Sequence, residues 1–155
     1  MGVSALDVAK YILKRQSVSK NWKCITNLKL QKILYYVQGY HLAFFNTPLF
    51  CEKISALQYW PVVKKVYQEY NSYWPNIIDE QYSDFNVYSL GLSEEQIKLI
   101  HSISDYYGRF SAFQLVDMTH NESPWIRVSE GGLKIGWDVE ISHNQLFSFF
   151  KKQLS

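Results

Sequence analysis

The sequence predicts a mainly α fold, a compact single-domain helical structure around a buried central helix at about 27–45, with at most a few short β segments. Three observations support this prediction. The chain has 155 residues, the usual length of one domain. Several serines are followed three residues later by a carboxylate or an amide, which is the pattern of a helix-capping box. The segment 27–45 is apolar nearly all round, as expected for a helix at the centre of its domain.

Helix starts recur along the whole chain. The capping pattern, followed by apolar residues at helical spacing, occurs at four serines: Ser4, Ser93, Ser111 and Ser142. Because proline suits the first turn of a helix, two more helices are expected to start at Pro61 and Pro124. A chain with this many helix starts leaves little room for a sheet.

The remaining segments read as connectors. Residues 46–60 and 76–92 have no helical spacing, although a short strand fits between 50 and 57. Apolar residues alternate between 135 and 141, so this stretch is either a strand or an ordered loop. No repeat or linker divides the chain, and a single domain over residues 1–155 is expected.

The central helix is the most unusual predicted element. Its N-cap is expected to be Thr26 or Asn27, whose side-chain oxygens accept from the first free backbone amides of a helix. One face gathers six apolar residues: Leu30, Ile33, Leu34, Val37, Phe44 and Phe45. We expect Phe44 and Phe45, together with Phe149 and Phe150, to pack around this helix in the core.

Composition excludes several classes of protein. The 16 basic and 14 acidic residues give a net charge of +2, too little for the basic surface that drives DNA binding. No run of 18 apolar residues occurs, so no membrane span is predicted. The two cysteines, Cys24 and Cys51, are too few for a disulfide framework and fit reduced thiols in a cytoplasmic protein.

No motif indicates an enzyme, a metal site or a cofactor. The four histidines lie in separate segments without paired ligand spacing. The run from His120 to Glu122 matches half of a zinc deaminase signature, but no cysteine follows Cys51 to complete it. A nucleophilic pair of Cys24 with His120 has no local support. Glycine-rich phosphate loops and a nucleophile elbow are absent from the sequence.

Three groups of residues remain as candidates for binding, and each has a structural alternative. On the central helix, Gln31 and Gln38 lie seven residues apart on one stripe, and His41 is either a buried hydrogen-bonded imidazole or a ligand contact. Trp60 either packs under a helix start or anchors a partner from the surface. His120 and Glu122 are close enough in a predicted turn to pair with each other. The candidate partner-binding residues are therefore Lys29, Gln31, Gln38, His41, Tyr59, Trp60, Pro61, His120, Glu122 and Trp125.

Taken in this order, the three groups resemble the Panacea domain family, which includes SocA-like antitoxins and phage-associated GepA-like proteins. The matching stretches run from position 4 to about 150 and include 4–13, 25–43, 48–50, 59–67, 107–108, 111–112 and 119–125. One departure concerns Trp60, which stands where the family usually has glycine before Pro61. If that glycine needs a positive φ, Trp60 implies an altered turn, and otherwise it implies a changed binding surface.

The resemblance implies an antitoxin-type protein-binding domain rather than an enzyme. Such a domain neutralises a cognate toxin by direct contact in a type II toxin–antitoxin system, and the toxin is expected to be encoded by the adjacent gene. A first alternative is a proteolytic adaptor that delivers the bound toxin to a ClpXP-type protease. A second alternative is a small-ligand-binding or enzymatic domain that uses His41, His120 and Glu122. A DNA-binding autoregulator is disfavoured by the low charge and the lack of a recognition helix.

Overall fold

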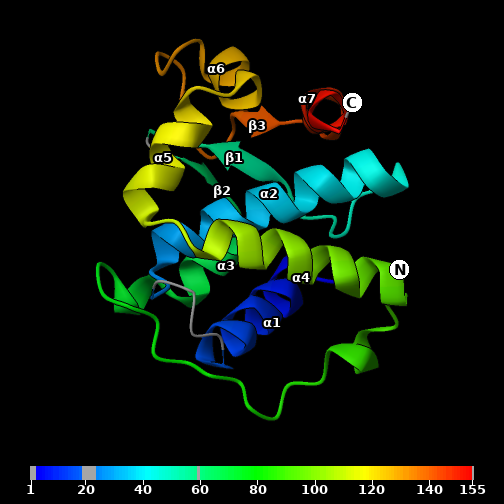
Figure 1. Ribbon diagram of the computed structural model, residues 1–155. Coiled ribbons are helices and arrows are strands. Elements are labelled where there is room, and N and C mark those ends of the chain that lie inside the picture. Colours follow the sequence, from blue (N-terminus) through cyan, green and yellow to red (C-terminus); the bar gives the residue numbers. More distant parts are fainter. Residues whose placement is uncertain (1–2, 19–23, 59, 155) are drawn as a thin grey trace.

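The computed structural model describes residues 3–18, 24–58 and 60–154 (Figure 1). These residues form seven α-helices, two short 3-10 helices and three short strands. In chain order, they are α1 (Ala5–Val18), α2 (Asn27–Phe45), β1 (Ile54–Ala56), β2 (Pro61–Val62), α3 (Lys64–Glu69), η1 (Asn71–Tyr73), η2 (Val87–Leu90), α4 (Glu94–Gly108), α5 (Ala112–His120), α6 (Ser123–Ser129), β3 (Glu140–Ile141) and α7 (His143–Gln153). The mainly α prediction is confirmed.

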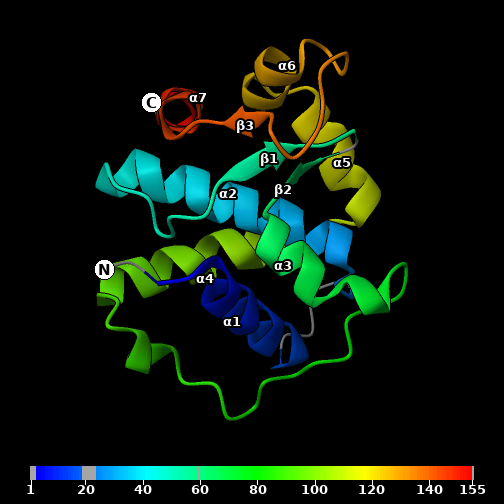
Figure 2. The same ribbon diagram turned by 180° about the vertical axis from the view of Figure 1, so that it is seen from behind.

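Helix α2 lies at the centre of the molecule, as predicted. In both views α1 and α4 lie below it, while the sheet, α6 and α7 lie above it (Figures 1 and 2). Nearly all of its residues are buried, polar ones included. Thr26 is the N-cap, and its hydroxyl accepts from the backbone N–H of Lys29 at 3.3 Å. Helices α1, α3, α4, α5 and α7 all pack against α2, so the central helix fixes where they lie.

The predicted helix caps are confirmed. Ser93, Ser111 and Ser142 each form a full capping box with the glutamine three residues later. Ser4 and Asp7 make the same reciprocal exchange before α1, because the Ser4 hydroxyl accepts from the Asp7 N–H at 3.0 Å. Four of the helices therefore begin where local side-chain chemistry satisfies the first backbone amides.

The small antiparallel sheet has the order β2-β1-β3. Its register pairs Ser55 with Val62 and Ile54 with Ile141, so the strand expected between 50 and 57 is confirmed. The prediction that a helix starts at Pro61 is wrong. Pro61 belongs to the edge strand β2, where a proline is tolerated because no ladder amide is lost on the inner side. The helix that follows, α3, begins only at Lys64.

None of the helices in the described ranges is long and apolar enough to cross a lipid bilayer.

Candidate binding groove

A groove runs along the C-terminal half of α2, between α4 on one side and α7 on the other. Its volume is about 970 Å³. Helices α4 and α7 lie below and above this half of α2 in Figure 1. The walls are mainly apolar and aromatic, and they include Tyr40, Phe44, Ile103, Tyr106, Tyr107, Met118, Phe149, Phe150 and Leu154.

Phe44 contradicts the prediction that it packs in the core. It is 55% exposed in the last turn of α2, where its side chain lines the groove. Tyr106 of α4 is 48% exposed and lines the opposite wall. The predicted burial is confirmed for Phe150, whereas Phe149 is only partly buried. Large aromatic surfaces that stay open to water in a groove are typical of binding sites.

The floor of the groove is a stack of aromatic rings from three helices. Tyr36 of α2 and Tyr107 of α4 are parallel, with ring centroids 3.7 Å apart and planes 4° from each other. Phe150 of α7 meets Tyr36 edge-on at 6.0 Å and contacts Tyr40 at 4.8 Å. Edge-to-face pairs such as that of Tyr36 with Phe150 stabilise a cluster beyond the area they bury. The floor is therefore a rigid surface that ties α2, α4 and α7 together.

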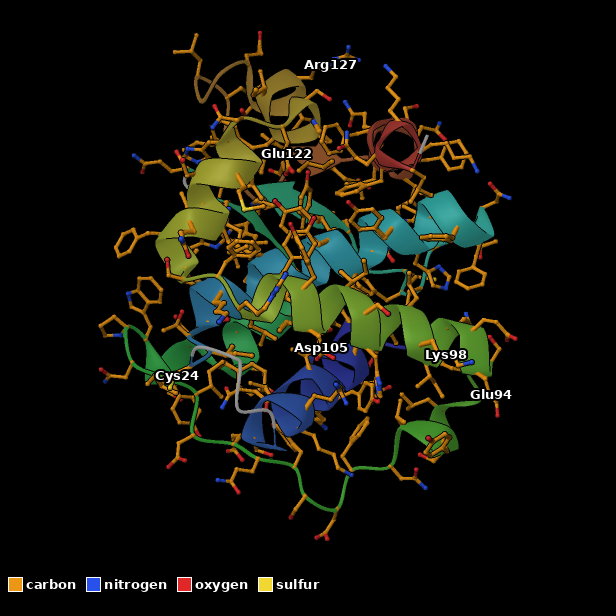
Figure 3. All side chains as sticks on the ribbon, in the orientation of Figure 1. Cys24, Glu94, Lys98, Asp105, Glu122 and Arg127 are labelled. Atoms are coloured by element: carbon orange, nitrogen blue, oxygen red, sulfur yellow. The ribbon has the colours of Figure 1, made fainter. Side chains whose placement is uncertain are left out.

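A carboxylate lies at the inner end of this aromatic floor. Glu122 occupies the N-cap position of α6, but its side chain makes no capping hydrogen bond. Instead, the Tyr36 hydroxyl donates to its two oxygens at 3.1 and 3.2 Å. Figure 3 shows Glu122 at the junction of α5 and α6, above α2. Burial raises the pKa of Glu122 to about 7, although the Tyr36 hydroxyl and the positive charge of Lys32 oppose this shift.

Two lysines of α2 are buried beside the floor. Lys29 donates to the backbone oxygen of Gly108 at 2.6 Å, and Lys32 donates to the hydroxyl of Thr119. Burial lowers the pKa of Lys32 to about 6, against the attraction of Glu122. Because an ammonium group in a low-dielectric interior is unfavourable, Lys32 holds its proton weakly. The predicted binding residue Lys29 thus joins α2 to the end of α4 from inside the protein.

The shifted pKa values of Glu122 and Lys32 together predict an unusual pH dependence of stability. The folded state holds the proton of Glu122 more tightly than the unfolded state, whose pKa is near 4.5, so this stabilisation is complete below pH 4.5 and is lost as the pH rises through about 7. Lys32 changes the stability in the opposite direction, because its pKa falls from 10.5 to about 6 on folding. Its contribution to stability therefore rises from pH 6 toward pH 10. The two trends cancel between pH 6 and 7, where we expect their summed contribution to be lowest.

Chemical denaturation at a series of pH values would measure this effect. Glu122→Gln should remove the loss of stability between pH 4.5 and 7, and Lys32→Met should remove the gain above pH 7. If the stability difference between either variant and the wild type stays constant over these ranges, the corresponding group titrates normally in the folded protein.

The other polar residues predicted on α2 have partners inside the protein. Gln31 accepts from the Val63 N–H at 2.9 Å, which fixes the end of β2. Gln38 donates to the backbone oxygen of Phe50 at 2.7 Å and so holds the chain that follows the helix. The His41 imidazole bonds with Thr47 O at 2.7 Å and with the Gln96 side chain at 3.0 Å. All three side chains are fully buried, so direct contact with a partner would need a rearrangement.

His120 and Glu122 are not paired as their spacing suggested. His120 stacks on Trp125, with ring centroids 4.2 Å apart and planes 21° from each other, while Glu122 points to Tyr36. Trp125 is only 5% exposed, and its indole N–H donates to the backbone oxygen of Leu57 at 3.0 Å. The predicted turn therefore divides into a packed tryptophan and a carboxylate that faces the groove.

Trp60, directly before Pro61, does not line the groove. Tyr59 falls outside the described residues. Trp60 is half-buried and stacks on Trp74 at 6.1 Å, and its carbonyl accepts from the Leu57 N–H at 3.0 Å in the turn between β1 and β2. Positive φ angles of non-glycine residues occur elsewhere in the described ranges, not at Trp60. The turn therefore accommodates a tryptophan without left-handed strain.

The second alternative function needs His41, His120 and Glu122 to act together. The structure gives the three side chains different partners. His41 bonds with Thr47 and Gln96, His120 stacks on Trp125, and Glu122 accepts from Tyr36. Among residues 3–18, 24–58 and 60–154, no group of three or more histidine, cysteine, aspartate or glutamate side chains could hold a metal ion.

A helical domain with an open, aromatic groove belongs to the class of domains that bind other molecules through shape and apolar contact. The comparison with known families makes this class specific. The family model for the antitoxin SocA-like, Panacea domain matches residues 30–126, from α2 to the first turns of α6. The chain belongs to this family, which supports an antitoxin-type role with a toxin as partner. Searches of curated proteins and of solved structures find no significant match.

Proposed function

We propose that this protein is a non-enzymatic antitoxin of a type II toxin–antitoxin system that binds its toxin directly through the groove between α2, α4 and α7. The observation that carries the proposal is the set of half-exposed aromatic side chains around the groove, led by Phe44 and Tyr106. Most of the groove lies within the family match, since the groove-lining residues of α2 and α4 all fall inside residues 30–126. We further propose that the toxin is encoded by the adjacent gene and that both proteins act in the cytoplasm.

Partner binding at the groove is favourable because its walls lose water on contact. Burial of apolar surface stabilises a complex by roughly 25 cal/mol for each Å². Aromatic residues at the centre of an interface contribute most of the binding energy in known complexes. The rigid floor adds to this, since rings that are already ordered lose little conformational entropy on binding.

The test is co-expression of the adjacent gene with variants of this protein. Phe44→Asp and Tyr106→Asp should each weaken toxin binding by roughly 30-fold or more and abolish rescue of growth, because each places a charge in an apolar contact. Phe113→Asp is the matched control, since Phe113 is 85% exposed on α5 and does not line the groove. Binding would be measured by calorimetry and neutralisation by growth.

The outcomes of this experiment separate three possibilities. Groove variants that neutralise as well as the wild type, or an adjacent gene product that is harmless alone, would overturn the proposal. The adaptor alternative predicts in addition that the toxin has a shorter half-life when this protein and a ClpXP-type protease are present. A half-life that does not depend on this protein supports neutralisation by direct occlusion.

A further inference from the structure

The groove is mainly apolar, but charged side chains also line it. Three charged side chains line it in the described part of the chain: Glu95, Lys98 and Glu122. Glu95 and Lys98 are exposed, three residues apart on α4, so their opposite charges offset each other at the rim. Figure 3 shows Lys98 near the N-terminal end of α4, well away from Glu122. The inner end of the groove is therefore marked by a single carboxylate.

The Glu122 carboxylate has acceptor capacity to spare. A carboxylate can accept about four hydrogen bonds. The hydroxyls of Tyr36 and Tyr35 both face this carboxylate, which leaves part of that capacity unused. The same side chain lines the groove. A ligand that enters the groove with a hydrogen-bond donor can therefore reach an acceptor that is already ordered.

The surroundings of this carboxylate favour a flat, delocalised cation. The faces and edges of Tyr40, Tyr107 and Phe149 line the groove together with Glu122. A guanidinium group stacks on aromatic rings and donates two parallel hydrogen bonds to a carboxylate. An ammonium group is more strongly hydrated and cannot form the planar pair, so arginine fits this site better than lysine.

We infer that the groove recognises a segment of the partner protein that presents one arginine, which pairs with Glu122, between apolar side chains that cover Phe44 and Tyr106. This inference rests on the proposed function and names the chemistry of the toxin surface that would bind. A protein segment is favoured over a small molecule because the groove, at about 970 Å³, extends well beyond the volume of one arginine side chain. Its half-exposed rim would stay uncovered by a guanidinium compound alone.

The pairing predicts that binding releases protons. Burial holds the pKa of Glu122 at about 7 in the free protein, so at neutral pH the carboxyl is partly protonated, and a guanidinium stabilises its ionised form. Other titratable groups face Glu122 from α2 and α4, and they include Lys32, Tyr35, Tyr36 and Tyr107. The tyrosines stay neutral because their pKa values are raised, and an incoming cation disfavours the charged form of Lys32. The proton release is therefore expected from Glu122, because Lys32, with a pKa of about 6, is already mostly neutral at pH 7.

The experiment uses the full chain and synthetic amphipathic peptides of about twelve residues with leucines at helical spacing. One peptide carries a central arginine, and its matched control carries citrulline, which has the same shape without the charge. We expect the arginine peptide to bind roughly 10- to 100-fold more tightly to the wild type. For Glu122→Gln the two peptides should bind equally. Calorimetry in two buffers with different ionisation enthalpies should show proton release for the arginine peptide with the wild type.

Each other outcome is informative. Equal binding of the two peptides to the wild type, or no effect of Glu122→Gln, would overturn the inference. If butylguanidine binds as tightly as the arginine peptide, the site takes a small ligand and the protein-segment inference fails. Toxin neutralisation that is lost in Phe44→Asp but unchanged in Glu122→Gln would reject the arginine while leaving the proposed function intact. Circular dichroism of Glu122→Gln serves as the folding control.

Discussion

Replacement of Trp125 by alanine should lower the free energy of unfolding by about 3–5 kcal/mol, the range for large aromatic residues in well-packed cores. Trp125 is almost fully buried, stacks on His120 and donates its indole N–H to Leu57 O. It also lies under the turn after α6, where a Cβ added at Gly132 would meet the indole at 3.4 Å. The substitution would leave a cavity between α6 and β1 and an unpaired carbonyl at Leu57.

Chemical denaturation measures this effect, and the chain provides a matched control. Trp60 is also a tryptophan, but it is only half-buried, and the packing contact described for it is a stack on Trp74. Trp60→Ala should therefore lower the free energy of unfolding by less than half as much as Trp125→Ala. The opposite ranking would mean that Trp60 holds the fold. A Trp125→Ala variant with normal stability but no toxin binding would make Trp125 an interface residue.

The helix starts were predictable from the sequence because they depend on side chains only a few residues apart. A serine and an amide three residues apart satisfy each other's backbone groups whatever lies around them, so Ser93, Ser111 and Ser142 mark helix starts reliably. The central position of α2 followed from its composition, since a helix that is apolar on all sides has no face to give to water. Pro61 shows the limit, because strand pairing with β1 outweighs the preference of proline for a helix start.

The site was less predictable because its contacts join segments that are distant in sequence. Lys32 meets Thr119, Tyr36 meets Glu122, and each pair is separated by more than 80 residues. The sequence placed Gln31, Gln38 and His41 on the central helix, but it did not show that Val63, Phe50, Thr47 and Gln96 would supply their partners. Phe44 lies on the same face as buried residues, and helical spacing alone does not show that this end of the face is open.

A signal for the groove was nevertheless present in the sequence. Tyr106 and Tyr107 are adjacent on α4, so their side chains point in different directions around the helix. Tyr107 packs on Tyr36 and is buried, while Tyr106 is half-exposed. Phe149 and Phe150 of α7 repeat this arrangement, since Phe150 is buried and Phe149 only partly so, whereas the adjacent Tyr35 and Tyr36 of the central helix are both buried.

The contact between α2 and α7 depends on one glycine, and this dependence predicts a second large effect. A Cβ at Gly39 would lie 2.2 Å from the ring of Phe150, which is closer than any two carbon atoms can approach without a bond. The ring cannot easily move aside, because Tyr35, Tyr40 and Phe149 surround it with centroids 4.8–5.5 Å away. We therefore expect Gly39→Val to lower the free energy of unfolding by about 3 kcal/mol or more.

A double-mutant cycle distinguishes this clash from a general intolerance of side chains in α2. Phe150→Ala alone should cost about 3–5 kcal/mol, because it leaves a cavity under Gly39. In Gly39→Val with Phe150→Ala the valine occupies part of that cavity, so the double variant should be more stable than the sum of the two losses by roughly 0.5–3 kcal/mol. Strictly additive losses would show that the two side chains do not meet. Because Phe150 also forms the groove floor, the double variant should still bind the toxin more weakly than the wild type.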